Sequence, residues 1–289
     1  MSRPQKPSWS DWIQGMGLRA ILRASRVFPL DTRIAILGWV TKTIVRLVPS
    51  LRNRIETNLR LIYPDMPAEE RRRIRHAVAF GLGRHVVETF SPEDFALRAG
   101  STPISGPGFE ALKSAQAEAR GVIILSGHFG NWEVARLRLS ALGYPVAGIY
   151  RPQNNPYFEA DFRGSLDAAK APVFAKGAKG MREMLRYLRR GGIAAILLDQ
   201  RDSRGEALDF MGKPAMTPTA IAEMARRNDL PLIPLFCTRL ADGKSFEIEM
   251  EAPIPKGDAT SMTQAFNDAL TARVQAHPEQ WHWLHRRWK

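Results

Sequence analysis

One strand–turn–helix pattern near the middle of the chain constrains the fold most. Residues 122–126 (Val-Ile-Ile-Leu-Ser) form a short apolar run with three β-branched residues, which is typical of a buried strand. A turn that contains glycine follows, and Asn131 is a good N-cap for a helix over residues 132–142. A buried strand that leads directly into a helix is the repeating unit of an α/β sheet.

The same alternation of apolar runs and helical periodicity continues toward the carboxyl terminus. It predicts an α/β fold with a mixed, mostly parallel sheet that is covered by helices on both faces. The expected strands are 144–151, 193–199, 230–238 and 245–251, and the expected helices are 68–90, 156–169, 178–190, 219–227 and 260–276.

Composition adds a strong basic charge and excludes disulfide bonds within the chain. The 289 residues carry a formal net charge of +13, and the single cysteine, Cys237, lies in an apolar run where we expect a core residue. Residues 1–60 contain eleven Lys or Arg against three acids, a field that attracts anionic partners. We expect a basic amphipathic helical region over 1–50 and a main domain over 51–289.

The N-terminal region has the pattern of helices that lie on a membrane surface. Leu37, Val40, Ile44 and Leu47 repeat at helical spacing, and Trp39 stands beside them. No run reaches the roughly 18 uncharged apolar residues of a membrane-spanning helix. Basic amphipathic helices with tryptophan suit the interface of an anionic bilayer. The alternative is that these helices pack on the main domain with their arginines in water, and both can be true in part.

A candidate general base lies on the turn after the first strand. His128 follows the carboxyl end of residues 122–126, the edge where open α/β sheets bind their ligands. Glu133 comes five residues later, in the first turn of the helix, and could orient the imidazole. Neutral histidine can take a proton from an alcohol that attacks a carbonyl. The alternative is an ordinary helix-capping turn on which His128 and Glu133 are surface residues without a catalytic role.

Two further strand ends place polar residues at the same edge of the predicted sheet. Arg151 ends strand 144–151 and could bind phosphate through its planar fork, or pair with an acid of the following helix. Asp199 and Gln200 end the strand after Gly192. Asp199 could orient His128, bind a sugar hydroxyl or hold the neighbouring Arg201.

Other catalytic or ligand-binding patterns are absent from the sequence. The nucleophile-elbow pattern G-x-S-x-G and the nucleotide-binding patterns G-x-G-x-x-G and Walker A do not occur. No metal is expected, because no acid or cysteine accompanies His277, His282 and His285. His85 falls in a helical pattern and is expected on the surface or in packing.

The segment His128-Phe-Gly-Asn-Trp-Glu133 resembles the H-x4-D/E motif of glycerolipid-type acyltransferases. More narrowly, the chain is similar to the bacterial lipid A late acyltransferases, the lauroyl and myristoyl transferases. Other segments match in order from about residue 50 to the end: Tyr150-Arg-Pro, Leu198-Asp-Gln, Phe210-Met-Gly-Lys-Pro-Ala and Pro278-Glu-Gln-Trp. The order of these segments is what makes the resemblance specific.

The resemblance implies a glycerol-3-phosphate-acyltransferase-like fold and transfer of a fatty acyl group from acyl-acyl carrier protein to a hydroxyl of a lipid A precursor. It implies action at the cytoplasmic face of the inner membrane, without metal or cofactor. The partners would be acyl carrier protein, a phosphorylated glycolipid acceptor and an anionic membrane surface, with no nucleic acid. The implied site residues are His128, Glu133, Asn131, Arg151, Asp199, Gln200 and Gly212.

Several points stay open at this stage. Asn131 and backbone N–H groups would stabilise the oxyanion, and Gly212 would allow an acyl chain to approach in the long segment 202–217, whose alternative is a small hairpin. The three C-terminal tryptophans are expected to close the domain with buried rings. The acceptor could instead be a lysophospholipid or a glycosylated phosphoinositide. The alternative from another class is a non-catalytic basic protein that binds membrane or nucleic acid.

Overall fold

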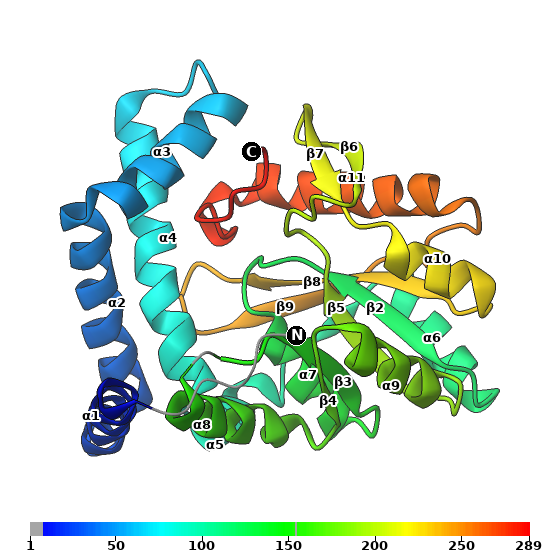
Figure 1. Ribbon diagram of the computed structural model, residues 1–289, viewed down its shortest axis with the longest axis horizontal. Coiled ribbons are helices and arrows are strands. Elements are labelled where there is room, and N and C mark those ends of the chain that lie inside the picture. Colours follow the sequence, from blue (N-terminus) through cyan, green and yellow to red (C-terminus); the bar gives the residue numbers. More distant parts are fainter. Residues whose placement is uncertain (1–7, 154) are drawn as a thin grey trace.

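A seven-stranded sheet forms the centre of the computed structural model, which describes residues 8–153 and 155–289 without the side chains of Gln14, Leu18, Ile21 and Ala168. The strand order is β1-β9-β8-β2-β5-β3-β4 (Figure 1). The bounds are β1 Ile104–Ser105, β2 Val122–Ser126, β3 Val146–Tyr150, β4 Val173–Ala175, β5 Ile193–Leu197, β8 Leu232–Arg239 and β9 Phe246–Met250.

The sheet is mixed and mostly parallel, as the sequence predicts. Five adjacent strands run parallel to one another: β8, β2, β5, β3 and β4. Strand β9 pairs antiparallel with β8, and β1 runs parallel to β9. The central strand β2 is buried along its whole length. Its carboxyl end therefore opens at an edge that the other four parallel strands share.

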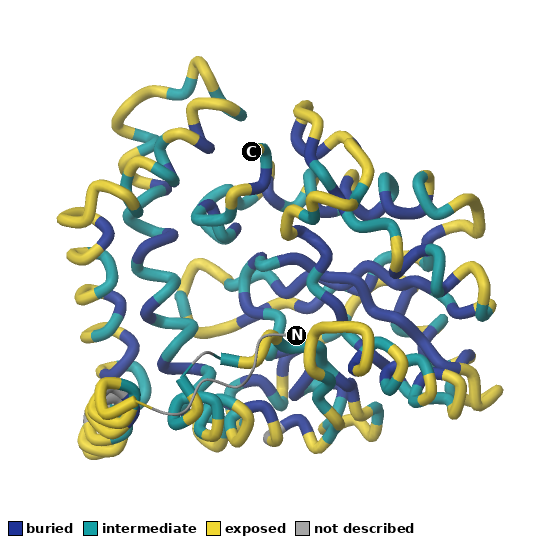
Figure 2. The backbone as a smooth tube through the Cα atoms, viewed as in Figure 1, coloured by how far each residue is buried: buried dark blue, intermediate teal, exposed yellow. Residues whose placement is uncertain are grey.

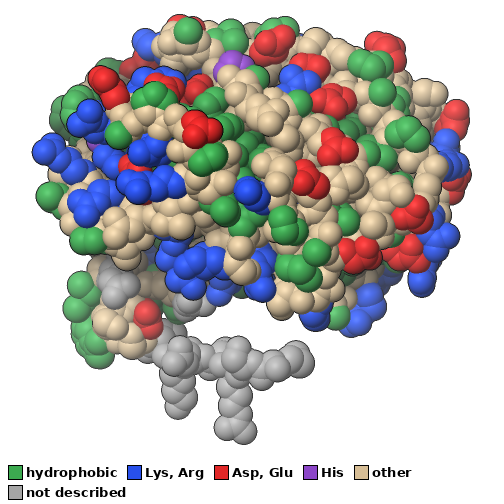
Figure 3. Space-filling model, turned by 90° about the horizontal axis from the view of Figure 1, so that it is seen from above, with side chains coloured by type: hydrophobic (Ala, Val, Ile, Leu, Met, Phe, Trp, Pro, Cys, Tyr) green, Lys and Arg blue, Asp and Glu red, His purple; other side chains and the backbone are tan. Residues whose placement is uncertain are grey.

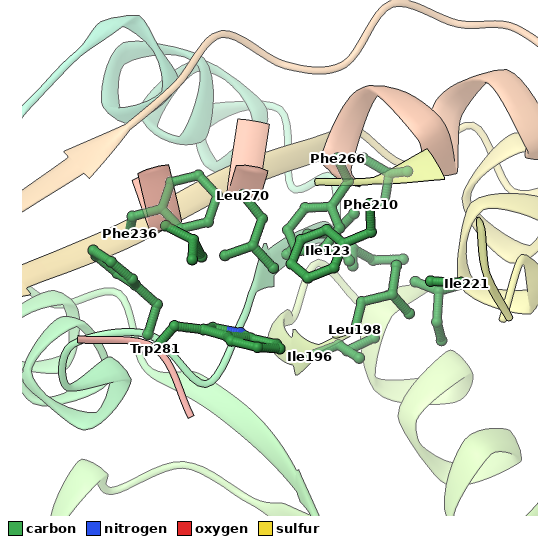
Figure 4. Close-up of a cluster of buried hydrophobic side chains, with 14 of the residues drawn as sticks. Ile123, Ile196, Leu198, Phe210, Ile221, Phe236, Phe266, Leu270 and Trp281 are labelled. Atoms are coloured by element: carbon green, nitrogen blue, oxygen red, sulfur yellow. The ribbon is translucent and has the colours of Figure 1, made fainter. Parts of the chain in front are cut away.

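Helices cover both faces of the sheet, which confirms the predicted fold class. Val122 and Ile124 of β2 belong to one hydrophobic cluster, whereas Ile123 and Leu125 belong to the other. Figure 4 shows part of the second cluster, in which Trp281 joins strand and helix side chains. The first cluster packs under α5 Pro92–Ala99, α6 Pro107–Ala117 and α7 Trp132–Ala141, and the second under α9 Ala178–Leu188, α10 Ala220–Arg227 and α11 Ala259–Ala276.

The long segment predicted as a loop over 202–217 is a two-stranded hairpin, the alternative left open above. Strands β6 Glu206–Phe210 and β7 Lys213–Thr217 pair antiparallel and leave two residues in the turn. Phe210 is fully buried against Trp281 and Trp288. Trp281 and Trp283 are buried too, so the C-terminal rings close the domain as expected.

Four N-terminal helices form a layer beside the sheet (Figure 1). Their bounds are α1 Trp9–Ser25, α2 Leu30–Leu47, α3 Pro49–Ile62 and α4 Ala68–Thr89, and α8 Pro156–Leu166 packs on α1. The expected domain boundary at residue 50 falls in the first turn of α3, and the division of the chain there stays a prediction.

Helix α2 is apolar on two sides. Its inner side packs on α4, where Thr41 Oγ1 donates to the Ala79 carbonyl at 2.8 Å. Its outer side exposes Ile36, Trp39, Val40, Ile44 and Leu47, and many residues of α2 are coloured as exposed in Figure 2. In the described chain no single helix has the length and apolar character of a membrane span. Helices α2 and α3 pass that test only together, across a bend of 86°.

Candidate active site

The register of the sheet brings His128 and Asp199 together. Ser126 at the end of β2 pairs with Leu197 at the end of β5, and each of the two site residues lies two positions further on. His128 Nδ1 is 2.7 Å from Asp199 Oδ1, and the backbone N–H of His128 donates to Asp199 Oδ2 at 2.9 Å. Seventy-one residues separate the partners in sequence.

The carboxylate of Asp199 is fully buried and held by three N–H groups. Besides His128, the indole Nε1 of Trp281 donates to Asp199 Oδ2 at 2.9 Å. Burial alone would raise the pKa of Asp199, but the His128 imidazole and the hydrogen-bond donors outweigh it and hold that pKa below its ordinary value. Asp199 is therefore a carboxylate at neutral pH, and it fixes the ring orientation of His128.

Glu133 does not make the expected hydrogen bond to His128. Its Oε2 accepts from Arg136 at 2.7 Å, and no hydrogen bond between His128 and Glu133 occurs in the described part of the chain. Since Glu133 starts a helix while His128 sits on the preceding turn, the short sequence spacing did not bring them into contact. The acid that pairs with His128 is Asp199, one of the roles left open for that residue.

Asn131 is buried in the turn that follows His128. It is 1% exposed; its Oδ1 caps α7 by accepting from the Glu133 N–H at 3.0 Å, and its Nδ2 donates to Glu88 at 2.7 Å. Glu88 is also fully buried and pairs with Arg239 at 2.6 Å. Both ends of its amide hold this turn in place, and the expected role of Asn131 in stabilising an oxyanion stays a prediction.

The other expected site residues lie at different distances from His128. Gln200 Nε2 is 3.5 Å from His128 Nε2, so the structure brings these two together.

Gly212 is exposed in the hairpin turn. Its φ is 75°, and that of the preceding Met211 is 58°. A two-residue turn of this kind needs glycine, and the expected role of Gly212 along an acyl chain stays a prediction.

Arg151 lies at the expected edge of the sheet but apart from the His128 contacts. It is exposed just past the end of β3, two strands away from β2. The acids considered as its partners are engaged elsewhere: Glu159 accepts from Tyr150, and Asp161 pairs with Arg19. The proposed phosphate contact of Arg151 stays a prediction.

Three further histidines surround the catalytic candidate, and the sequence reasoning missed them. The His128 ring lies 4.5 Å from the His285 ring and 6.0 Å from the His282 ring, and Trp132 lies between His128 and His85. Burial lowers the pKa of His85 and His285 to about 4 and that of His282 to about 3. All three are neutral at pH 7. The available signal was that half of the six histidines fall within residues 277–285.

A groove of about 890 Å³ opens beside His128. Helix α4 forms one wall, and the end of β8 and the C-terminal segment form the other. Apolar side chains of α4, such as Phe80 and Leu82, line the groove together with the cation Arg84. Arg84 stacks on Phe80 at 5.0 Å and forms no ion pair in the described chain. A groove with an apolar wall and an unpaired cation suits a lipid that carries phosphate.

The donor atoms of His128, Asp199 and His285 lie within 4.8 Å of one another and could approach a metal ion. However, His128 Nδ1 and Asp199 Oδ1 already share a hydrogen bond of 2.7 Å. A metal would have to replace that bond, so the donor set fits an acid–base pair better than a zinc site, which needs each ligand atom free.

Comparison with known proteins adds the family. A family model described as bacterial lipid A biosynthesis acyltransferase matches residues 5–289. The lipid A biosynthesis lauroyltransferase of Escherichia coli K12 is 28% identical over 97% of this chain and 92% of its own length. The palmitoleoyltransferase of the same strain is 28% identical over 96% and 91%, respectively.

Two more distant similarities were found. A phosphatidylinositol mannoside acyltransferase of Mycobacterium tuberculosis H37Rv is 28% identical over 63% of this chain and 58% of its own length. The crystal structure of a 1-acyl-sn-glycerophosphate acyltransferase from Thermotoga maritima is 11% identical and covers 88% of this chain and 99% of that one, with a TM-score of 0.38. Because the family model spans nearly the whole chain, this protein belongs to the bacterial lipid A biosynthesis acyltransferase family.

Proposed function

We propose that the protein transfers a fatty acyl group from an acyl-acyl carrier protein thioester to a hydroxyl of a phosphorylated lipid A precursor. The observation that supports this most is the His128–Asp199 hydrogen bond of 2.7 Å at the mouth of a groove with an apolar wall. The family supplies the reaction class, and the geometry supplies the base.

His128 acts as the general base in this proposal. Asp199 holds a proton on Nδ1, which leaves Nε2 as the basic nitrogen. Nε2 takes the proton of the acceptor hydroxyl as its oxygen attacks the thioester carbonyl. The tetrahedral intermediate collapses, the C–S bond breaks, and the proton held by His128 passes to the leaving thiolate. The acyl group moves directly between substrates, so no acyl-enzyme forms.

Two groups near His128 Nε2 suit the other needs of the reaction. The amide of Gln200 lies 3.5 Å from Nε2 and can hydrogen-bond an acceptor hydroxyl there. Helix α7 begins at Trp132, four residues after His128, and helix-start N–H groups favour developing negative charge. The Glu133 and Val134 N–H groups are bound by Asn131, so the Trp132 N–H is the backbone donor for the oxyanion in this proposal.

Arg84 is the cation best placed to bind phosphate in the groove. Burial, and then the charge of Arg239, lower its pKa to about 10, so it stays protonated at neutral pH. Arg239 is already paired with Glu88. An arginine that lies in a groove and has no carboxylate partner is ready for an anionic ligand. Phosphate on the acceptor, or on the prosthetic arm of the carrier, has this chemistry.

The exposed side of α2 supports a place at the cytoplasmic face of the inner membrane. Trp39 is 60% and Leu47 71% exposed, although the opposite side of the same helix is packed on α4. An apolar stripe rimmed by cations, among them Lys42 over the Trp39 ring at 4.3 Å, suits the interface of an anionic bilayer.

Purified protein with radiolabelled acyl-acyl carrier protein and a defined lipid A precursor tests the proposal. His128→Ala should lower kcat/KM by about 10²–10⁴-fold, the usual loss for a general base, while circular dichroism shows an intact fold. Lys179→Ala is the control, because Lys179 is exposed on α9 and does not line the groove. Normal turnover by His128→Ala would refute the mechanism.

A second acceptor class comes from the mycobacterial relative, which is named a phosphatidylinositol mannoside acyltransferase. The same labelled donor offered with a lipid A precursor, a lysophospholipid or a phosphatidylinositol mannoside separates the candidates. Transfer to the lipid A precursor alone supports the proposed acceptor, and transfer to the mannoside alone replaces it.

A further inference from the structure

A second concave site lies between helices α3 and α4, away from His128. It is a pocket of about 550 Å³, and its charged lining consists of five arginines and one acid: Arg52, Arg60, Arg71, Arg72, Arg75 and Glu56. Figure 3 shows Lys and Arg side chains gathered on the side of the molecule where α3 and the start of α4 lie. The proposed acyl transfer makes no use of this pocket.

Glu56 orders part of the pocket and leaves the rest unpaired. Its carboxylate accepts from Arg75 and lies 3.6 Å from Arg71, and all three side chains are less than one-fifth exposed. These two arginines more than neutralise the acid. Arg52, Arg60 and Arg72 form no ion pair with any described acid, so the pocket holds a large excess of positive charge.

The pocket begins where the apolar stripe of α2 ends. Leu47 and Val48 are exposed at the junction of α2 and α3. The guanidinium of Arg52 turns back to the Arg46 carbonyl at the same junction, at 3.4 Å. A bilayer that receives the stripe of α2 in its interface would therefore meet this pocket at the depth of its headgroups.

We propose that the pocket between α3 and α4 binds the phosphate of an anionic phospholipid headgroup and so fixes how the protein sits on the membrane. The planar guanidinium of arginine can donate two parallel hydrogen bonds to two oxygens of one phosphate, which the ammonium of lysine cannot do. The paired Arg71 and Arg75 form a rigid side of the site, and the three unpaired arginines close on the phosphate. This binding needs no acyl donor or acceptor, so it stands or falls apart from the proposed reaction.

Sedimentation with phosphatidylcholine vesicles that contain phosphatidic acid tests the site. The triple variant Arg52→Gln/Arg60→Gln/Arg72→Gln should bind at least ~10-fold more weakly than the wild type. The control Arg182→Gln/Arg186→Gln/Arg190→Gln removes the same charge from exposed arginines on and just after α9 and should keep most of the affinity. An equal loss in both variants overturns the site in favour of overall charge.

A charge-preserving variant separates a phosphate site from a merely basic surface. Arg52→Lys/Arg60→Lys/Arg72→Lys keeps every charge and loses the forks, so it should also bind these vesicles several-fold more weakly. Vesicles made equally anionic with cholesteryl hemisuccinate, a carboxylate lipid, should not distinguish it from the wild type. Unchanged binding of the lysine variant to phosphatidic acid overturns the proposal.

Two competitors identify other occupants. Inorganic phosphate at millimolar concentration should not displace the protein from vesicles, because a lipid phosphate gains from the neighbouring apolar stripe; full displacement would assign the pocket to a soluble phosphate. Acyl carrier protein should bind the wild type and the glutamine variant alike. Loss of carrier binding in that variant, with vesicle binding intact, would make the pocket a carrier-docking site and overturn the lipid proposal.

Discussion

At the scale of single residues, the hydrogen bonds of Asp199 determine what His128 can do. One carboxylate oxygen faces the imidazole, and the other accepts from the His128 backbone and from Trp281. With both oxygens engaged, the carboxylate has one orientation and the imidazole one tautomer. The rate of the proposed reaction should therefore depend on residues that never touch a substrate.

The identity of the partner acid can be tested by a matched pair of amide substitutions. Asp199→Asn should lower kcat/KM by about 10²–10⁴-fold, because the amide cannot stabilise the imidazolium. Glu133→Gln breaks a nearly buried ion pair with Arg136 and should lower the melting temperature, but it leaves the His128–Asp199 hydrogen bond in place, so kcat/KM should fall by less than about 10²-fold. Steady-state kinetics on both variants, with thermal melts as a fold control, measure the difference. If Glu133→Gln proves as damaging as Asp199→Asn, the assignment of the partner acid is wrong.

Trp281 is a positioning residue whose effect should appear in the pH profile. Trp281→Phe keeps an aromatic ring in the core and removes the N–H bound to Asp199 Oδ2. Without this donor the carboxylate stabilises a protonated His128 ring more strongly. The acid limb of the pH profile of log kcat/KM should therefore move to higher pH. Trp283→Phe removes a comparable N–H, which donates to the Pro278 carbonyl. That control should lose stability and leave the acid limb in place.

Site residues could be predicted only where an apolar, strand-like run ends at a polar residue. The positions of His128, Asp199 and Gln200 followed from apolar runs that stop at polar residues, and the structure brings all three together. The pairing with Asp199 depends on β2 lying next to β5, which spacing along the chain does not encode. The five-residue spacing to Glu133 pointed to the wrong acid, because local proximity in sequence was taken for contact.

At the scale of elements, strongly apolar or periodic segments were predictable and short ones were not. The strands β2, β5 and β8 are buried on both faces, and their β-branched runs stood out. The hairpin was only the alternative to a loop, because its strands alternate polar and apolar residues over only five positions each. Helices α5 and α6 were missed because each is short and starts at a proline, which resembles a loop.

The contact between α2 and α4 depends on glycine at one position and can be tested against its neighbour. A Cβ at Gly83 would lie 2.3 Å from the Leu37 carbonyl oxygen, whereas a Cβ at Gly81 meets nothing within 4 Å. Gly83→Ala should therefore lower the free energy of unfolding by about 1–3 kcal/mol. Gly81→Ala should raise it by about 0.5–1 kcal/mol through helix propensity. Urea titrations measure both values, and a stabilising Gly83→Ala would show that the two helices do not approach as closely as described.

At the scale of the whole molecule, charge and apolar surface meet on one side. The sequence showed the excess of arginine in its first 60 residues and the stripe on α2, and from these we predicted an anionic partner. It did not show a pocket, because Arg52 and Arg60 of α3 meet Arg72 of α4 only when the helices pack. Composition therefore suggests the class of partner, and tertiary packing determines where that partner would bind.

Three half-buried histidines make the stability of the whole molecule depend on pH. Burial lowers the pKa of His85 and His285 to about 4 and that of His282 to about 3 in the folded chain, from an ordinary value of 6.5. Below pH 6.5 the unfolded chain binds more protons, so the free energy of unfolding should fall as the pH decreases from about 6.5 to 4. At pH 5 each histidine should account for a loss on the order of 2 kcal/mol.

Denaturant titrations at several pH values, with a matched pair of variants, isolate this effect. His282→Gln should flatten the pH dependence of the free energy of unfolding, whereas His277→Gln, at a half-exposed position, should leave it unchanged. Asp199 does not interfere, because its pKa lies below its ordinary value and its contribution is lost only at still lower pH. A wild-type free energy of unfolding that stays constant between pH 7 and pH 5 would mean that these imidazoles are open to solvent, and the packing of the C-terminal segment around His128 would have to be revised.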